Sequence, residues 1–116
     1  MEWLVINTIV CPFSGTAFSA VQAVRNLKLI IWYSAEELLD PGDVFHPFSN
    51  LLIVNKKPRK IVIYSVQAFN NNRWYQLKNS LGCPKNNDKG NELCKIKSLC
   101  RFRLCPYEKE MNIVYH

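Results

Sequence analysis

The sequence predicts a small α+β domain with an antiparallel β-meander, one or two N-terminal helices and an irregular cysteine-rich C-terminal segment. Three observations favour this class. The 116 residues suit one domain, apolar runs of strand length recur between turn residues, and four of the five cysteines lie after residue 80. We expect a single domain over 1–116, made of an apolar segment over 1–26, an α/β core over 27–78 and a basic cysteine-rich segment over 79–116.

The N-terminal segment is strongly apolar, because residues 3–24 carry no charged side chain. We expect a strand over 3–10 and a helix over 14–26, since Pro12 and Gly15 interrupt any longer element. Both elements would be buried in the core.

Two alternatives for this segment remain open. About 20 apolar residues can span a bilayer, so residues 3–24 could associate with a membrane. The small residues before Ala20 also fit a secretory cleavage site, but a signal peptide begins with positive charge and this chain begins with Glu2. We expect the N-terminus to be retained, which favours an intracellular location over a secreted or membrane-associated one.

The next stretch combines an apolar run with helix and turn signals. Residues 27–33 predict a strand. Ser34 and Glu37 have the spacing of a capping box, in which each side chain satisfies a free backbone donor of the first helical turn. A short helix is therefore expected, and the turn residues of 40–43 end it.

Two hairpins are expected to follow. Strands over 51–54 and 60–66 would pair across a turn at 55–59, and a second turn at 70–72 would lead into an outgoing strand over 73–78. Aromatic side chains on strands usually belong to the core. The aromatic residues expected to pack on this sheet are Tyr64, Trp74 and Tyr75.

The charge is divided unevenly along the chain. Residues 1–50 hold two basic and five acidic side chains, whereas residues 51–116 hold thirteen basic and four acidic ones, a net charge of +9. Such a field attracts polyanions, so nucleic acid or another acidic partner is expected. The alternative is a solvated basic surface without a partner. The side chains expected to contact a polyanion are Lys95, Lys97, Arg101 and Arg103.

Four cysteines cluster in a polar segment with few apolar residues. Four thiolates could bind one zinc ion tetrahedrally, whereas two disulfides would staple the segment in an oxidising compartment. The spacing lacks the Cys-x-x-Cys pairs that would select zinc, so zinc, disulfides and free thiols all remain open. The clustered residues are Cys83, Cys94, Cys100 and Cys105.

The end of this cluster resembles the zinc fingers that use three cysteines and one histidine. Cys94, Cys100, Arg101 and Phe102 match that motif in place, but Leu104 stands where the family has its histidine. The resemblance implies RNA binding, with an aromatic ring stacked on a base and arginines near phosphates.

The motif Cys11-Pro12-Phe13-Ser14 resembles the one-cysteine variants of glutaredoxin-like and related thioredoxin-fold proteins. The resemblance implies a redox enzyme in which Cys11 is catalytic. A thiol at a helix N-terminus is activated because free N–H groups and the helix dipole stabilise the thiolate. The alternative, which we favour, is a cysteine that serves as a small apolar core residue.

Neither histidine has an acid or a nucleophile at useful spacing, so no catalytic triad is indicated. We therefore expect a non-enzymatic, basic binding or structural protein, without a catalytic residue, that is organised by its C-terminal cysteines. Three alternatives stay open. They are a one-cysteine redox protein using Cys11, a small secreted disulfide protein, and a reading frame without selected function.

Overall fold

The computed structural model describes residues 2–23, 27–81, 83, 86 and 100. These residues form seven strands and one helix, so the expected α+β class is wrong and the protein is mostly antiparallel β-sheet. The elements in chain order are β1 (Trp3–Cys11), β2 (Thr16–Gln22), β3 (Lys28–Ser34), β4 (Val44–Phe48), β5 (Leu51–Val54), β6 (Lys57–Arg59), β7 (Ile63–Ala68) and α1 (Asn71–Ser80).

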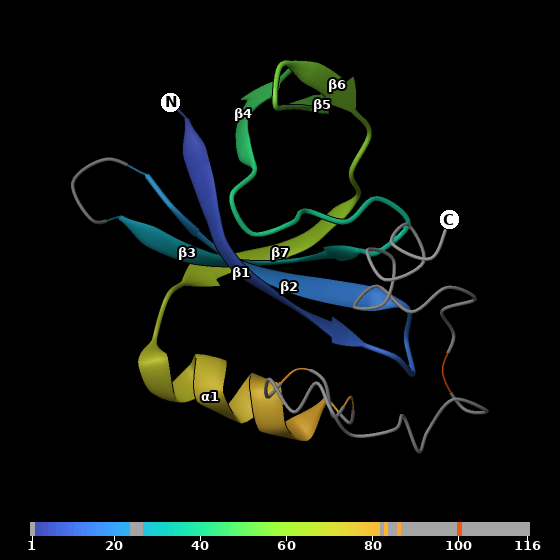
Figure 1. Cartoon of the computed structure of the whole chain (residues 1–116), viewed down its shortest axis with the longest axis vertical. Helices are drawn as coiled ribbons and strands as arrows, with labels where there is room; N and C mark the ends of the chain where they lie inside the picture. Colours follow the sequence, from blue (N-terminus) through green and yellow to red (C-terminus); the bar gives the residue numbers. More distant parts are fainter. Residues whose placement is uncertain (1, 24–26, 82, 84–85, 87–99, 101–116) are drawn as a thin grey trace, which may run out of the picture.

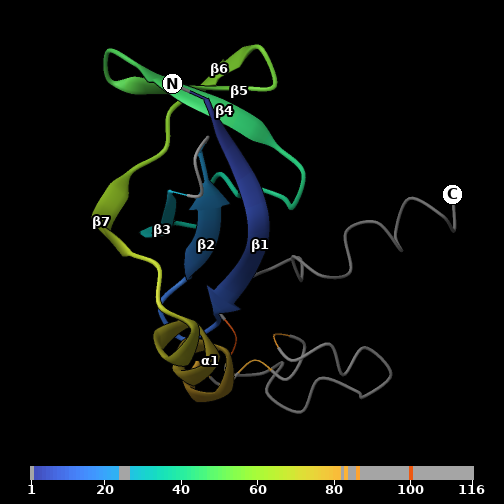
Figure 2. The same cartoon turned by 90° about the vertical axis from the view of Figure 1, so that its left-hand side faces the viewer.

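The strands form one sheet in the order β6-β5-β4-β1-β2-β3-β7. Strands β1–β3 and strands β4–β6 are two meanders, which meet where β1 pairs with β4 at Trp3 and Leu4. The β4–β6 meander lies at one end of the molecule and α1 at the other (Figures 1 and 2). The chain therefore leaves β6 and β7 as the two edges of the sheet.

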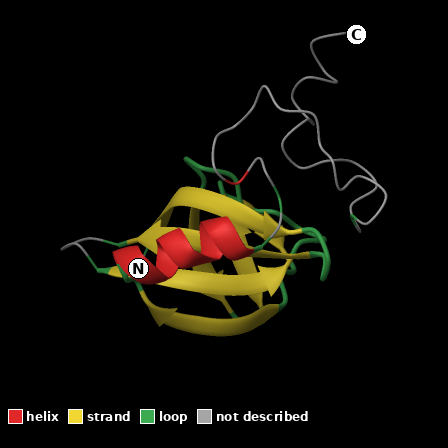
Figure 3. Cartoon of the chain, turned by 90° about the horizontal axis from the view of Figure 1, so that it is seen from below, coloured by secondary structure: helices red, strands yellow, loops and turns green. Residues whose placement is uncertain are grey.

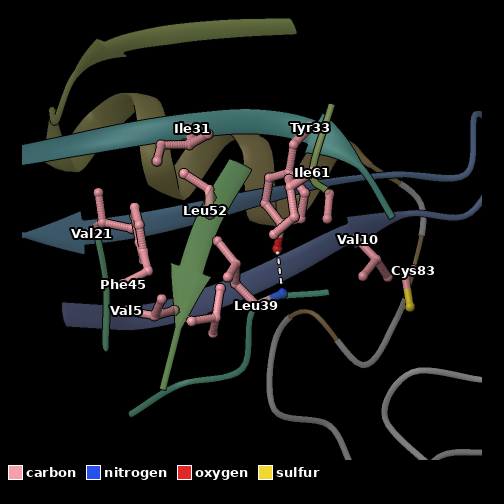
Figure 4. Packing of buried hydrophobic residues seen from close by; sticks show 12 residues of the cluster. Val5, Val10, Val21, Ile31, Tyr33, Leu39, Phe45, Leu52, Ile61 and Cys83 are labelled. Atoms are coloured by element: carbon pink, nitrogen blue, oxygen red, sulfur yellow. Dashed lines mark hydrogen bonds between the residues drawn. The ribbon is translucent and has the colours of Figure 1, made fainter. Parts of the chain in front are cut away.

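The sheet curls around an interior hydrophobic core (Figure 4). Side chains alternate between the two faces of a strand, so one face of each strand supplies this core. Tyr33 and Leu39 are completely buried in it. The other members shown include Val5, Val21, Ile31, Phe45 and Leu52.

Helix α1 covers the outer face of strands β1–β3 (Figure 3). Trp74 and Leu77 are three residues apart, so they lie on the same helix face and point to the sheet. This second apolar cluster consists of Ile9, Ala20, Ile30, Trp74 and Leu77.

The helix expected over 14–26 is wrong, because β2 is a strand. Gly15 adopts a φ of 69°, and its N–H donates to the carbonyl oxygen of Cys11 at 3.0 Å. The chain therefore reverses directly after β1. Residues 16–22 then pair with β1 on one side and β3 on the other, and these two ladders outweigh a weak local helix preference.

The short helix expected from Ser34 is also wrong, because Ser34 ends β3. The N–H of Ser34 donates to the carbonyl oxygen of Val62 at 2.9 Å, and the N–H of Ala35 donates to the β1–β2 turn. These sheet contacts hold the backbone extended. The side chain of Glu37 forms an exposed 3.7 Å ion pair with Arg59 instead of a capping box.

The predicted hairpins of the middle region pair differently. Strand 51–54 is confirmed as β5, but it pairs with β6, while β7 pairs with β3. The strand expected over 73–78 lies within α1 and is wrong. Asn70 is the N-cap of this helix, since its Oδ1 accepts the N–H of Arg73 at 3.1 Å.

The apolar N-terminal segment forms sheet strands rather than a long helix. The strand expected over 3–10 is confirmed as β1, and the strand expected over 27–33 as β3. In the part of the chain that the structure describes, no helix is long and apolar enough to cross a membrane. Most of the segment expected to be cysteine-rich lies outside the described residues.

Candidate functional site

Three hydroxyl groups form a buried network with the loop that follows β3. The N–H of Leu39 donates to Tyr33 Oη at 3.0 Å, drawn as a dashed line in Figure 4, and Thr8 Oγ1 donates to the carbonyl oxygen of Leu39 at 2.6 Å. Ser19 Oγ lies 2.7 Å from Thr8 Oγ1 and 2.8 Å from Tyr33 Oη. Because the Thr8 proton is used on Leu39, Ser19 donates to Thr8 and Tyr33 donates to Ser19. Each donor in this ring has an acceptor.

This network is structural rather than catalytic. The Tyr33 side chain is completely buried, and burial raises the pKa of its phenol above the ordinary 10.0, because a phenolate there would lose its hydration. The phenol therefore stays protonated and holds the loop on the sheet. It presents no group to a substrate.

Asn86 attaches a distant segment to the end of β1. Its Oδ1 accepts the N–H of Val10 at 3.1 Å, and its Nδ2 donates to the carbonyl oxygen of Val10 at 2.8 Å. The amide side chain thus replaces a neighbouring strand at this position. The sequence offered no signal for this contact, because the two residues are 76 positions apart.

Cys11 does not occupy an activated position. It is the last residue of β1, is partly exposed and pairs with Thr16 across the turn. Since residues 16–22 are a strand, no helix N-terminus lies beside the thiol. The resemblance to one-cysteine thioredoxin-fold proteins therefore loses its physical basis.

The zinc or disulfide unit expected from the clustered cysteines is not supported. Cys83 packs in the interior core, and Cys100 is a partly exposed thiol outside any disulfide. Within the described ranges, no group of three His, Cys, Asp or Glu side chains could hold a metal ion. Cys94 and Cys105 lie outside the described residues, as do the expected polyanion contacts Lys95, Lys97, Arg101 and Arg103.

Exposed apolar side chains gather at and beside β7. We call these residues the β7 surface: Val62, Ile63, Tyr64 and Val66, with 49%, 38%, 50% and 53% of their areas exposed. Both faces of this strand carry exposed residues, in contrast to β2. Clustered apolar exposure of this kind is typical of a contact surface.

The aromatic residues beside β7 were expected to lie in the sheet core, and that expectation is only partly correct. Trp74 is buried, but it lies on α1 rather than on a strand. Tyr64 is half exposed, and Tyr75 is 69% exposed on the outer side of α1.

The Tyr64 ring has a firm support. Its centroid lies 4.8 Å from that of Trp32, and the Trp32 ring stacks at 6.0 Å on Phe18. The indole Nε1 of Trp32 donates to Thr16 Oγ1 at 2.9 Å, which fixes the orientation of the ring. An aromatic side chain held in place loses little conformational entropy on contact, a property of strong protein-binding residues.

The region around β7 is basic. Residues 44–80 contain six Lys or Arg side chains and no Asp or Glu. Lys60 precedes β7, and Arg73 follows it at the start of α1; both are exposed. At the same end, the Nζ of Lys28 lies 5.7 Å from the centre of the Phe69 ring. The β7 surface is therefore an uncharged apolar strip with positive charge at both ends.

A shallow pocket of about 120 Å³ lies where α1 begins. Ile6, Lys28, Phe69 and Trp74 contribute to its walls. The pocket is small for a drug-sized ligand, which needs roughly 300 Å³ or more. We therefore take the β7 surface, rather than this pocket, as the candidate site.

Sequence reasoning missed the β7 surface, although a signal for it was present. Residues 63–68 contain neither charge nor proline, whereas the other edge strand, β6, consists of Lys57, Pro58 and Arg59. Natural sheets protect their edges with charge and proline. The lack of charge and proline in a strand becomes a signal only when the strand is known to lie at the edge of the sheet.

Comparison with solved structures defines the class of fold. The crystal structure of Escherichia coli PmrD superposes on this chain with a TM-score of 0.54 at 17% identity, covering 66% of this chain and 93% of that one. The protein therefore has a PmrD-like antiparallel β fold.

The sequence comparisons then give the family. The model of the IraM/PmrD family matches residues 1–75, and the chain belongs to this family. It is 34% identical over 107 residues to "Anti-adapter protein IraM" of Klebsiella pneumoniae, covering 91% of this chain and 92% of the relative. It is 38% identical over 107 residues to the protein of the same name from Escherichia coli strain SE11, covering 92% and 97%.

These relatives correct the function expected from the sequence. We expected a cysteine-organised protein that binds nucleic acid or another polyanion. That expectation is wrong, because the relatives are named for action against an adapter, which is a protein. The three alternatives are also overturned. A redox protein, a secreted disulfide protein and a reading frame without selected function do not fit a member of the IraM/PmrD family.

Proposed function

We propose that this chain is an anti-adapter protein, which binds an adapter protein and prevents it from acting. The observation that carries the proposal is the 37–38% identity to Escherichia coli proteins named "Anti-adapter protein IraM", over 92% of this chain and 97% of theirs. The family model matches residues 1–75, which include all seven described strands and the start of α1.

The β7 surface supports this proposal. A protein that acts by binding another protein needs exposed apolar residues with a rigid anchor, and aromatic anchors dominate many interfaces. Tyr64 meets this requirement because it is half exposed and is backed by Trp32. The surrounding positive charge would attract an acidic partner and speed association.

The test is direct binding to the adapter against which Escherichia coli IraM acts. The purified adapter is titrated by calorimetry with this chain, and Escherichia coli IraM serves as the positive control. We expect a one-to-one complex. We also expect this chain to suppress the adapter-dependent activity at matching concentrations.

Two tyrosines provide matched variants for this test. Tyr64→Ala removes the anchor of the β7 surface, so we expect about tenfold weaker binding or more. Tyr75→Ala removes an equally large side chain that is 69% exposed on α1, and its affinity should stay within about twofold of the wild type. If the wild-type chain does not bind the adapter while the positive control does, the proposed function is wrong.

A further inference from the structure

The two edges of the sheet differ in a way that matters for recognition. Edge strand β6 has a Lys-Pro-Arg sequence, and charge and proline at an edge discourage pairing with another chain. Edge strand β7 has the sequence Ile-Tyr-Ser-Val-Gln-Ala, with no charge and no proline. Of these two edge strands, β7 is therefore the one without protection against pairing.

The hydrogen-bond register shows which backbone groups of β7 are available. The N–H of Phe69 donates to the carbonyl oxygen of Lys28 at 3.1 Å, so Phe69 faces β3. Successive residues of an antiparallel strand face alternate sides. The N–H and C=O groups of Val66 and Ala68 therefore point away from β3. Among the residues that the structure describes, no strand pairs with this edge.

We infer that β7 binds an extended segment of the partner protein as an added antiparallel or parallel strand, and that this segment has an apolar centre with acidic residues at its ends. This inference rests on the proposed function, which identifies the partner as an adapter protein. Backbone bonds to Val66 and Ala68 would provide affinity, as in other cases of β-strand addition. The side chains of Tyr64 and Val66 would contact the apolar centre of the segment.

The charges around β7 favour an acidic segment over a second copy of this chain. Lys60 lies before the strand, and Lys28 and Arg73 lie at its other end. Antiparallel pairing of two copies would bring Lys60 of one copy to the Arg73 end of the other, and like charges placed close together repel. The net charge of +6 adds to this repulsion.

The first test uses short synthetic peptides with the full-length chain. Each peptide alternates valine and threonine and carries two terminal charges at each end. One version has glutamates, a second has lysines, and a third keeps the glutamates but has alternate backbone nitrogens methylated. We expect the glutamate peptide to bind about tenfold more tightly than either of the other two. Equal binding of the methylated peptide would overturn the inference, because that peptide cannot complete a ladder of backbone hydrogen bonds.

Amide hydrogen exchange then locates the bound peptide. We expect the amides of Val66 and Ala68 to exchange at least about tenfold more slowly with saturating glutamate peptide, since each becomes a donor in a new ladder. Protection confined to the pocket around Ile6 and Trp74, or to β6, would place the peptide elsewhere and refute the inference. Protection of β7 without peptide, in a chain that sediments as a dimer, would show that a second copy occupies the edge.

Variants at Val66 separate this inference from the proposed function. Val66→Pro removes one outward N–H and should weaken both peptide and adapter binding about tenfold, whereas Val66→Thr keeps the N–H and should change them less than about threefold. If the adapter binds both variants equally well, the edge inference fails and the proposed function stands. If the peptide binds as expected but the adapter does not bind the wild type, the proposed function fails and the edge remains a peptide-binding site.

Discussion

Replacement of Tyr33 by phenylalanine tests the hydroxyl network that holds the loop after β3. The variant keeps the ring in the core but removes the acceptor of the Leu39 N–H and the donor to Ser19 Oγ. Leu39 is completely buried, so its N–H would lose its partner away from water. An unsatisfied buried donor costs about 1–3 kcal/mol. We therefore expect the free energy of unfolding to fall by about 2 kcal/mol.

For a domain of this size, a loss of about 2 kcal/mol lowers Tm by roughly 8 °C. Calorimetry and urea unfolding would measure both values. Tyr75→Phe is the matched control, because that side chain is 69% exposed, and its stability should stay within about 0.5 kcal/mol of the wild type. If Tyr33→Phe is equally close to the wild type, the network does not hold the loop and our assignment of its donors is wrong.

The same side chain predicts how stability changes in alkaline solution. Burial raises the pKa of Tyr33 in the folded chain above its ordinary value of 10.0, so the unfolded chain loses this proton first. The contribution of Tyr33 is then fully present below about pH 10 and is lost as the pH rises through its folded pKa. Urea midpoints measured from pH 8 to pH 11 should fall more steeply for the wild type than for Tyr33→Phe. Parallel curves for the two proteins would contradict this expectation.

Two further substitutions test contacts made by asparagine side chains. Asn70→Ala removes the N-cap of α1 and should lower the free energy of unfolding by about 1 kcal/mol in urea titrations; Asn72→Ala, inside the helix, is its control and should cost clearly less. Asn86→Ala removes both hydrogen bonds to Val10 and should cost about 1–3 kcal/mol, since the N–H of Val10 is buried. Amide exchange at Val10 should speed up in this variant, and unchanged protection there would show that Asn86 does not anchor the segment.

The unprotected β7 edge also affects the tendency of the isolated chain to aggregate. An exposed strand of apolar residues is a site of aggregation when no partner covers it. The charged residues around β7 limit this tendency, because Lys60 and Arg73 repel a second copy that approaches along the edge. The same charges would also favour the acidic segment inferred above.

The strands that could be predicted from the sequence are those with a continuous local signal. Strands β1, β3 and β5 are short apolar runs bounded by turn residues, and runs of that length and composition form strands in most settings. Residues 16–22 and 73–78 carry no such signal. The first mixes alanine and glutamine with threonine, phenylalanine and valine, a composition that selects neither structure, and the second follows three asparagines that resemble a hairpin turn.

The candidate site could not be predicted for a related reason. Tyr64 has the residue type and setting of a core aromatic, and its exposure follows only from the place of β7 at the edge of the sheet. The cysteines drew attention because clustered thiols have known chemistry, whereas the lack of charge and proline over residues 63–68 becomes informative only once β7 is known to be an edge strand. A binding surface is defined by what remains uncovered after folding.

By itself, the sequence determined the apolar runs that became β1, β3 and β5 and the basic character of residues 44–80, because both are properties of neighbouring residues. The tertiary structure alone decided that residues 16–22 are a strand between β1 and β3, that Tyr33 closes a hydrogen-bonded ring with Leu39, and that β7 is an open edge. Each of these depends on pairing between segments that are distant in the chain. The backbone hydrogen bonds and burial gained by such pairing outweigh weak local preferences. Their free energy cannot be estimated from neighbouring residues alone.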